Sequence, residues 1–89
     1  MNIDQAKKVY LHLFGYEPEE FNQEKFQNHY YGCYKTEELF AQNWLADHEQ
    51  MSPLLWSVVN IPHLLEELSY DYYWGYGEDE MLYVFSVDY

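Results

Sequence analysis

The sequence predicts a small α+β domain of three to four short helices and a C-terminal antiparallel β-hairpin or small sheet. Two patterns lead to this prediction. Apolar residues recur at helical spacing through most of the first seventy residues, and the last twenty change to aromatic and β-branched runs typical of strands. The chain has 89 residues and no repeat, low-complexity tract or Gly/Ser linker, so we expect residues 1–89 to form a single acidic domain.

The first third of the chain predicts two helices followed by an extended segment. Residues 3–14 carry apolar side chains at helical spacing, and Gly15 should end this helix. Residues 16–28 contain Pro18 and predict a loop followed by a short helix. Residues 29–35 (HYYGCYK) are rich in aromatic residues that favour strands and are broken by a glycine, so we expect a short extended piece with a bend.

Two helix start signals follow in the middle of the chain. Thr36 is a good N-cap, and the acids directly after it suit the first turn of a helix. The apolar stripe expected on this helix consists of Leu39, Phe40, Trp44 and Leu45. Pro53 suits the first position of a second helix, which predicts a short buried helix over residues 54–59.

Pro62 marks one more helix start, with Asn60 or Ile61 as the cap. The leucines of this helix should face inward and its acids outward; they are Leu64, Leu65 and Leu68, and Glu66 and Glu67.

The final twenty residues predict a β-hairpin. Its strands are residues 71–76 and 81–89, joined by the acidic sequence GEDE. In the second strand one alternate set is the more apolar, and we expect it to form the core face: Met81, Tyr83, Phe85, Val87 and Tyr89. Because an isolated hairpin is only marginally stable, this one should pack on the helices or pair with residues 29–35.

The net charge excludes several classes of partner. The chain has 4 lysines, no arginine and 16 acids, which gives a formal net charge of −12 with histidine neutral. Lysine and arginine supply the affinity of proteins for polyphosphates and for anionic lipids, so we do not expect direct binding to DNA, RNA or a membrane surface. Residues 36–89 hold eleven of the acids and no base.

We expect no cofactor, no metal and no catalytic activity. His29 and Cys33 have i, i+4 spacing, but their segment does not favour a helix and no second ligand pair follows, so ordinary packing is the better interpretation. The same pair lacks an orienting third group, and neither a phosphate-binding glycine loop nor a GxSxG motif is present. A single cysteine and the lack of a long apolar run or signal peptide predict a soluble cytoplasmic protein.

The concentrated acids predict a surface that imitates a nucleic acid. Carboxylates one helical turn apart are about 5.4 Å from each other, and a duplex carries a phosphate about every 3.4 Å per strand. Such a surface would bind a basic cleft, and its candidate residues are Glu37, Glu38, Asp47, Glu49, Glu66, Glu67, Asp71, Glu78, Asp79, Glu80 and Asp88. The alternative is a small non-catalytic adaptor that binds a protein partner through exposed Tyr and Trp, with the charge serving only solubility.

Residues 26–89 also carry motifs that resemble the C-terminal domain of the ArdA antirestriction proteins. The first is F-x-x-x-Y-Y-G-x-Y-x-T-E-E-x-F-A, from Phe26 to Ala41, and Pro53 follows it. The others are V-N-I-P-H-L-L-E-E-L (Val59 to Leu68), Y-D-Y-Y-W (Tyr70 to Trp74) and Y-V-F (Tyr83 to Phe85). Residues 1–25 match nothing in that family, and family members have three such domains where this chain supplies one.

The resemblance implies a non-catalytic DNA mimic made by a phage or mobile element and active in the host cytoplasm. The partner implied is the basic DNA-binding cleft of a defence enzyme, either a type I restriction-modification enzyme or, for a single-domain mimic, a CRISPR effector. Family members often form homodimers, and the hairpin edge and surplus tyrosines of this chain are compatible with one.

Overall fold

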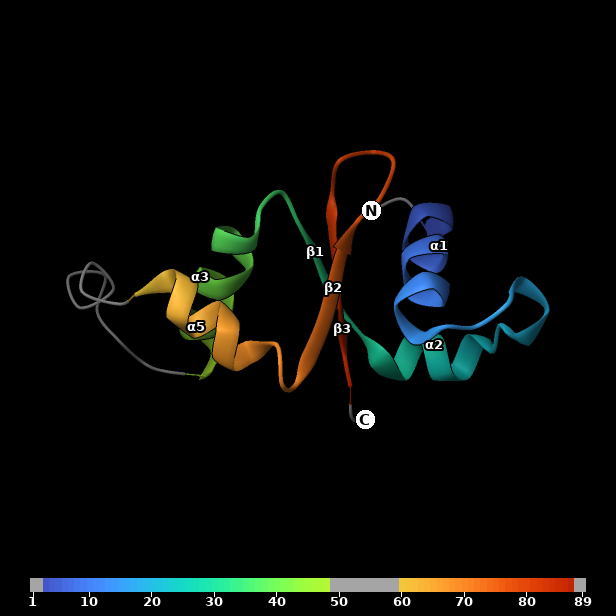
Figure 1. Ribbon diagram of the computed structural model, residues 1–89, viewed down its shortest axis with the longest axis horizontal. Helices are drawn as coiled ribbons and strands as arrows, with labels where there is room; N and C mark the ends of the chain where they lie inside the picture. The colour runs from blue at the N-terminus through green and yellow to red at the C-terminus, as the bar shows by residue number, and fades with distance from the viewer. Residues whose placement is uncertain (1–2, 49–59, 88–89) are drawn as a thin grey trace.

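The computed structural model describes residues 3–48 and 60–87 and is a small α+β domain (Figure 1). Its helices are α1 (Ile3–Phe14), α2 (Gln23–His29), α3 (Glu37–His48) and α5 (Ile61–Leu68), with a 3₁₀ turn at Pro18–Glu20. Its strands are β1 (Tyr30–Tyr34), β2 (Tyr72–Tyr76) and β3 (Leu82–Ser86). The fold class predicted from the sequence is confirmed, whereas the helix expected over residues 54–59 lies outside the described residues.

The three strands form one antiparallel sheet in the order β1-β3-β2. β2 and β3 are the predicted hairpin, and Gly77 N donates to Met81 O at 2.9 Å where the turn closes. β1 pairs with the other side of β3, which confirms the predicted pairing with residues 29–35. The bend expected at the glycine of this segment is a register shift between Tyr30 and Gly32.

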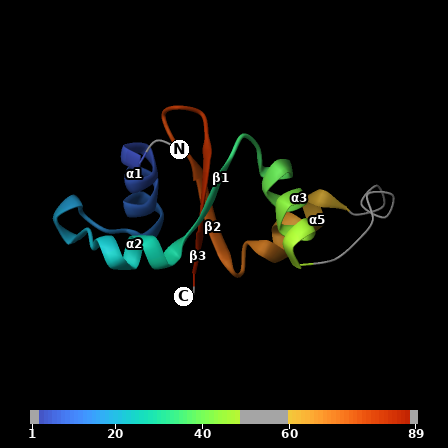
Figure 2. The same ribbon diagram turned by 180° about the vertical axis from the view of Figure 1, so that it is seen from behind.

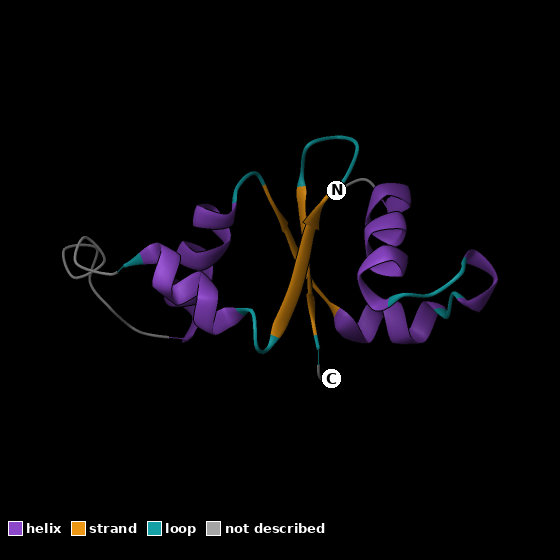
Figure 3. Ribbon diagram, viewed as in Figure 1, coloured by secondary structure: helices purple, strands orange, loops and turns teal. Residues whose placement is uncertain are grey.

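The helices form two layers, one on each face of the sheet. α1 and α2 cover one face and α3 and α5 the other, as both opposite views show (Figures 1, 2 and 3). β3 therefore lies between two cores: Tyr83 and Phe85 face α1 and α2, while Leu82 and Val84 face the other pair. The expectation of a single core face on this strand is wrong, because a central strand with helices on both faces buries both alternate sets.

The N-terminal helix is part of the first core. Ala6, Val9 and Tyr10 of α1 are buried in it, and the helix ends at Gly15, whose φ of +71° suits a glycine. α1 approaches β2 closely at Gly75, where an added Cβ would lie 3.4 Å from Val9 Cγ1. Residues 3–25, which belong to the segment without a family match, thus supply α1, the 3₁₀ turn and the start of α2 in this layer of the described fold.

Each helix of the second layer begins at a capping residue that the sequence indicated, Thr36 for α3 and Asn60 for α5. Thr36 Oγ1 accepts a hydrogen bond from Leu39 N and Asn60 Oδ1 accepts one from His63 N, both at 3.1 Å. Phe40, Ala41 and Leu45 of α3 are buried, and Leu68 of α5 joins them. Leu39 was expected on the apolar stripe but is 45% exposed, because α3 turns Phe40 rather than Leu39 toward the sheet.

Candidate acidic partner-binding surface

The first candidate acids lie at the start of α3. Glu37 and Glu38 occupy its first turn, directly after the Thr36 cap, where the unpaired backbone N–H groups and the helix dipole favour negative charge. Glu38 is exposed and Glu37 is half-buried. Asp47 is exposed in the last turn of α3, where the dipole is unfavourable to an acid, so helix stability does not explain its presence.

The acids of α5 and its end form a second group. Glu66 and Glu67 are exposed on α5, as predicted, while Leu68 is buried against the sheet. Glu67 lies 4.0 Å from His63 Nε2, one turn earlier on the same exposed face. Asp71 is exposed directly before β2, and its carbonyl accepts a hydrogen bond from Val87 N.

The hairpin turn holds three exposed acids, but they differ in what else they do. Asp79 is tied into the fold: Tyr83 Oη donates to its Oδ2 at 2.6 Å and Met81 N to its Oδ1 at 3.2 Å. The hydrogen bond from Tyr83 holds the pKa of Asp79 below its ordinary value. Glu78 lies against α1, its N–H donating to Gln5 Oε1 at 2.7 Å, and Glu80 adopts the left-handed region with a φ of 64°.

The sheet register places these acids in two groups at opposite ends of the molecule's sheet. Tyr34, Tyr76 and Leu82 share one row, so the start of α3 and the hairpin turn lie at the same end. Tyr72 pairs with Ser86 at the other end, where α5 leads through Asp71 into β2. The structure thus places eight of the eleven candidates in two groups rather than one row; Asp47 lies at the opposite end of α3 from Glu37, and Glu49 and Asp88 lie outside the described residues.

These carboxylates have little compensating charge. Of the nine candidate acids that the structure describes, one is paired with a lysine: the Glu78 carboxylate lies 3.9 Å from Lys8 Nζ, and both side chains are largely exposed. An exposed pair of this kind contributes at most about 1 kcal/mol. The negative field of α3, α5 and the segment to Asp71 is therefore directed at solvent.

Besides Asp4 on α1, sequence reasoning missed four more exposed acids near the N-terminus. They are Glu17, Glu19, Glu20 and Glu24, on the 3₁₀ turn and the start of α2. This segment lies at the end of the molecule opposite α3 and α5 (Figure 1). The Pro-Glu-Glu sequence at residues 18–20 could have indicated this acidic segment. The lysines in the first 35 residues nearly balance the acids there, so the net charge of that region did not reveal it.

β2 carries the exposed aromatic surface. Three of the large apolar side chains that are exposed lie on β2 or directly before it: Tyr70, Tyr73 and Tyr76, with Tyr70 74% exposed. The candidate residues predicted from the sequence did not include these three tyrosines. The adaptor alternative named exposed Tyr and Trp only in general as contacts with a partner.

The histidine and cysteine considered for chemistry have roles in packing. His29 is buried, and its Nδ1 lies 2.6 Å from the Ser86 carbonyl oxygen. Burial raises the pKa of the Cys33 thiol, which favours the less nucleophilic protonated form. Burial also raises the pKa of Tyr30 and Tyr31 to about 12, so both stay neutral. Within residues 3–48 and 60–87, no three His, Cys, Asp or Glu side chains are placed to hold a metal.

No model of a known protein family, no curated protein and no solved structure matches the chain. The resemblance to the ArdA proteins therefore rests on the motifs in the sequence. None of the described helices has both the length and the apolar character needed to cross a membrane.

Proposed function

We propose that the protein is a non-catalytic DNA mimic that inhibits a DNA-binding host-defence enzyme by occupying its basic cleft. The target class is a type I restriction-modification enzyme or a CRISPR effector. The observation that carries this proposal is the set of exposed acids on α3, α5 and the hairpin turn, with one lysine partner among the nine described.

The molecule's size suits a short duplex. It extends 46 Å along its longest axis, which corresponds to about 13 base-pair steps of 3.4 Å. Acids lie at both ends of that axis, because the 3₁₀ turn with Glu19 and Glu20 is at the end opposite α3 and α5 (Figure 1). The N-terminal acids therefore extend the proposed mimic beyond the ArdA-like region.

The proposal predicts that inhibition depends on ionic strength and on DNA. With a purified type I restriction-modification enzyme and a CRISPR effector as targets, affinity should fall at least about tenfold between 50 and 200 mM salt, because the contacts are between charges. Duplex DNA should compete with the protein for the target. Binding that is unchanged up to about 0.5 M salt would contradict the proposal.

Charge-neutralising variants test which surface is used. Glu66→Gln with Glu67→Gln should weaken inhibition at least about tenfold while the fold is unchanged, because both side chains are exposed. Glu78→Gln with Glu80→Gln tests the hairpin turn and leaves the Asp79 hydrogen bonds in place. Lys7→Gln with Lys8→Gln is the matched control: it changes two charges and should not weaken binding to a basic cleft.

Unchanged binding by both acidic double variants would instead support the adaptor alternative, in which the exposed tyrosines make the contacts. Circular dichroism and thermal unfolding of each variant separate lost binding from lost folding.

A further inference from the structure

β2 is an edge strand of the sheet. Half of its backbone N–H and C=O groups have no partner within the sheet. Val87 N donates to Asp71 O and Gly77 N to Met81 O, both at 2.9 Å, so the odd-numbered residues of β2 bond to β3. The alternation of an antiparallel pair then directs the N–H and C=O groups of Tyr72, Trp74 and Tyr76 away from β3. β2 lies in front in Figure 1, and no described segment crosses it.

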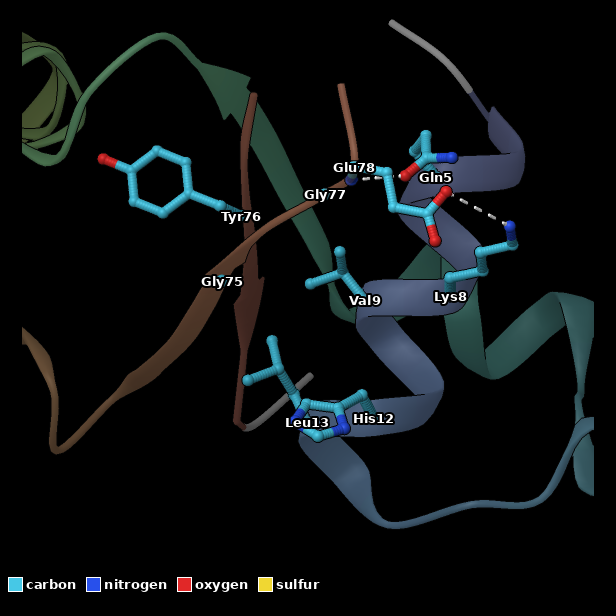
Figure 4. A pocket seen from close by; sticks show the side chains of 9 residues that line it. All are labelled: Gln5, Lys8, Val9, His12, Leu13, Gly75, Tyr76, Gly77 and Glu78. Carbon is cyan, nitrogen blue, oxygen red and sulfur yellow. Dashed lines mark hydrogen bonds and ion pairs between the residues drawn. The ribbon is translucent and has the colours of Figure 1, made fainter. Parts of the chain in front are cut away.

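A hollow lies beside the C-terminal half of this edge. It has a volume of about 170 Å³ and lies between α1 and β2, where Val9, Leu13 and Gly75 form its apolar part. Figure 4 shows Val9 and Leu13 pointing toward the strand, while Tyr76 points to the other face. Because Gly75 has no side chain, an added strand could place one of its own side chains here.

A second hollow lies beside the N-terminal half of β2. Its volume is about 210 Å³, and Leu13, Ser69, Tyr72, Tyr73 and Trp74 line it. Leu13 borders both hollows, and the residues of β2 that line them run from Tyr72 to Tyr76; the first hollow also has polar walls, from Gln5, Lys8 and Glu78. The outer edge of β1 differs, because the register shift between Tyr30 and Gly32 interrupts it.

The charges around β2 indicate what kind of strand fits. The strand itself (YYWGY) is uncharged, but Asp71 precedes it and Glu78 follows it, with Lys8 Nζ of α1 3.9 Å from the Glu78 carboxylate. Seven residue-to-residue steps of extended chain join these acids, which is about 23 Å. A complementary strand would be uncharged over its centre and carry Lys or Arg at both ends.

A second copy of this chain fits the same edge poorly. An antiparallel β2 pair centred on Trp74 would place Tyr70 opposite Glu78 and Asp71 opposite Gly77, so that Asp71 of one copy neighbours Glu78 of the other. A parallel pair would place Asp71 beside Asp71. Like charges at these positions are destabilising, and each chain carries a net charge of −12.

We infer that the β2 edge is a docking site for an extended, basic segment of a partner protein, which adds to the sheet as a fourth strand beside β2. Backbone hydrogen bonds from Tyr72, Trp74 and Tyr76 hold the segment, its alternate side chains enter the two hollows, and its terminal Lys or Arg residues face Asp71 and Glu78. The hydrogen bonds of this site come from the backbone of β2, while the two acids at its ends, Asp71 and Glu78, are shared with the proposed mimic surface.

Amide hydrogen exchange of the full chain, measured by NMR, tests this inference directly. In the protein alone, the amides of Tyr72, Trp74 and Tyr76 should exchange fast, and those of Tyr73 and Gly75 slowly. The probe is the peptide Lys-Lys-Thr-Val-Thr-Val-Thr-Val-Lys-Lys, which has an uncharged β-forming centre. It should slow exchange of the three outward amides at least about tenfold. Unchanged exchange at millimolar peptide would overturn the inference.

Matched probes separate strand addition from simple charge attraction. The same peptide with alternate backbone amides N-methylated keeps its charge but should give no protection, and a version with Glu in place of Lys should bind at least about tenfold more weakly. Equal protection by the N-methylated peptide would overturn the inference. Concentration-dependent protection of the same three amides in the protein alone would also overturn it, because it would show a second copy on the edge.

A pair of variants tests the same backbone groups. Tyr76→Pro removes one outward N–H, whereas Tyr76→Thr removes the ring and keeps the N–H. Peptide protection at Tyr72 and Trp74 should be lost in the first variant and kept in the second. Glu66→Gln with Glu67→Gln should keep it too, so failure of the docking site and failure of DNA mimicry have different results.

Discussion

Each of the two helical layers has one buried aromatic ring with many aromatic contacts, Tyr10 in the first and Phe40 in the second. The rings that contact Tyr10 and those that contact Phe40 come from different parts of the chain. Tyr10 on α1 contacts Phe14, Phe21 and Phe26, all from its own half, and reaches the sheet through Phe85. Among the described residues, Phe40 on α3 contacts four rings of the sheet: Tyr31, Tyr34, Tyr72 and Trp74. α3 and α5 also pack against each other, so the two layers differ in their aromatic contacts: those of Tyr10 lie mostly within its own half of the chain, whereas those of Phe40 are made with the sheet.

Charge divides the same two regions. Residues 3–29 hold three lysines against five acids, whereas residues 37–48 and 60–71 hold six acids and no lysine. Self-repulsion in the second region costs stability, and the apolar contacts of Phe40 and the leucines of α5 offset it. The region with the most exposed charge is thus the one whose central ring, Phe40, has fewer aromatic neighbours from its own part of the chain.

The largest effect should come from removing the Phe40 ring. Phe40→Ala should lower the free energy of unfolding by about 3–5 kcal/mol, because the ring is fully buried and four sheet rings contact it. Urea unfolding measures this, and amide exchange should show α3 and α5 losing protection before α1. The control is Leu39→Ala, next to it but 45% exposed, which should cost about 0.5 kcal/mol or less. Equal costs would contradict the asymmetry between these neighbours.

The helix caps should give a smaller effect that is alike in the two layers. Thr36→Ala and Asn60→Ala remove the caps of α3 and α5, and Asn22→Ala removes that of α2, where Oδ1 accepts from Lys25 N at 3.0 Å. Each should cost about 1 kcal/mol in thermal or urea unfolding. Thr36→Ser, which keeps the hydroxyl, should restore most of the loss. If Thr36→Ala and Asn60→Ala lowered stability but Asn22→Ala did not, α3 and α5 would depend on their caps more than α2 does, which would contradict this prediction.

The residues show which parts of this fold and site could be predicted. Local signals were sufficient for α1 ending at Gly15, for the cap at Thr36 and for the hairpin with its acidic turn, and they narrowed the cap of α5 to Asn60 or Ile61, of which the structure shows Asn60. The two-faced burial of β3 could not be predicted, since it depends on helices from both ends of the chain meeting one strand. Eight of the nine candidate acids that the structure describes are exposed, as expected, and Glu37 is half-buried; their division into two groups follows from strand order, which no local pattern encodes.

The smallest effect should separate Asp79 from the acids around it. Its pKa is held below the ordinary value by the Tyr83 hydrogen bond, so the stability it contributes is present above about pH 4 and is lost as pH falls through the lowered pKa. Asp79→Asn should therefore be less stable than the unmodified chain at pH 6, and the difference should shrink steadily as the pH is lowered below about 4. Urea unfolding across this range measures it.

Glu80→Gln is the matched control for Asp79→Asn, because it removes one charge from the same exposed turn. Its stability difference from the unmodified chain should be small and should not follow the titration of Asp79. Identical pH profiles for the two variants would mean that Asp79 is, like its neighbours, only a surface charge. A difference in the expected direction would mean that Asp79 anchors this turn to the first layer's side of the sheet, through Tyr83, while Glu80 stays available for a partner.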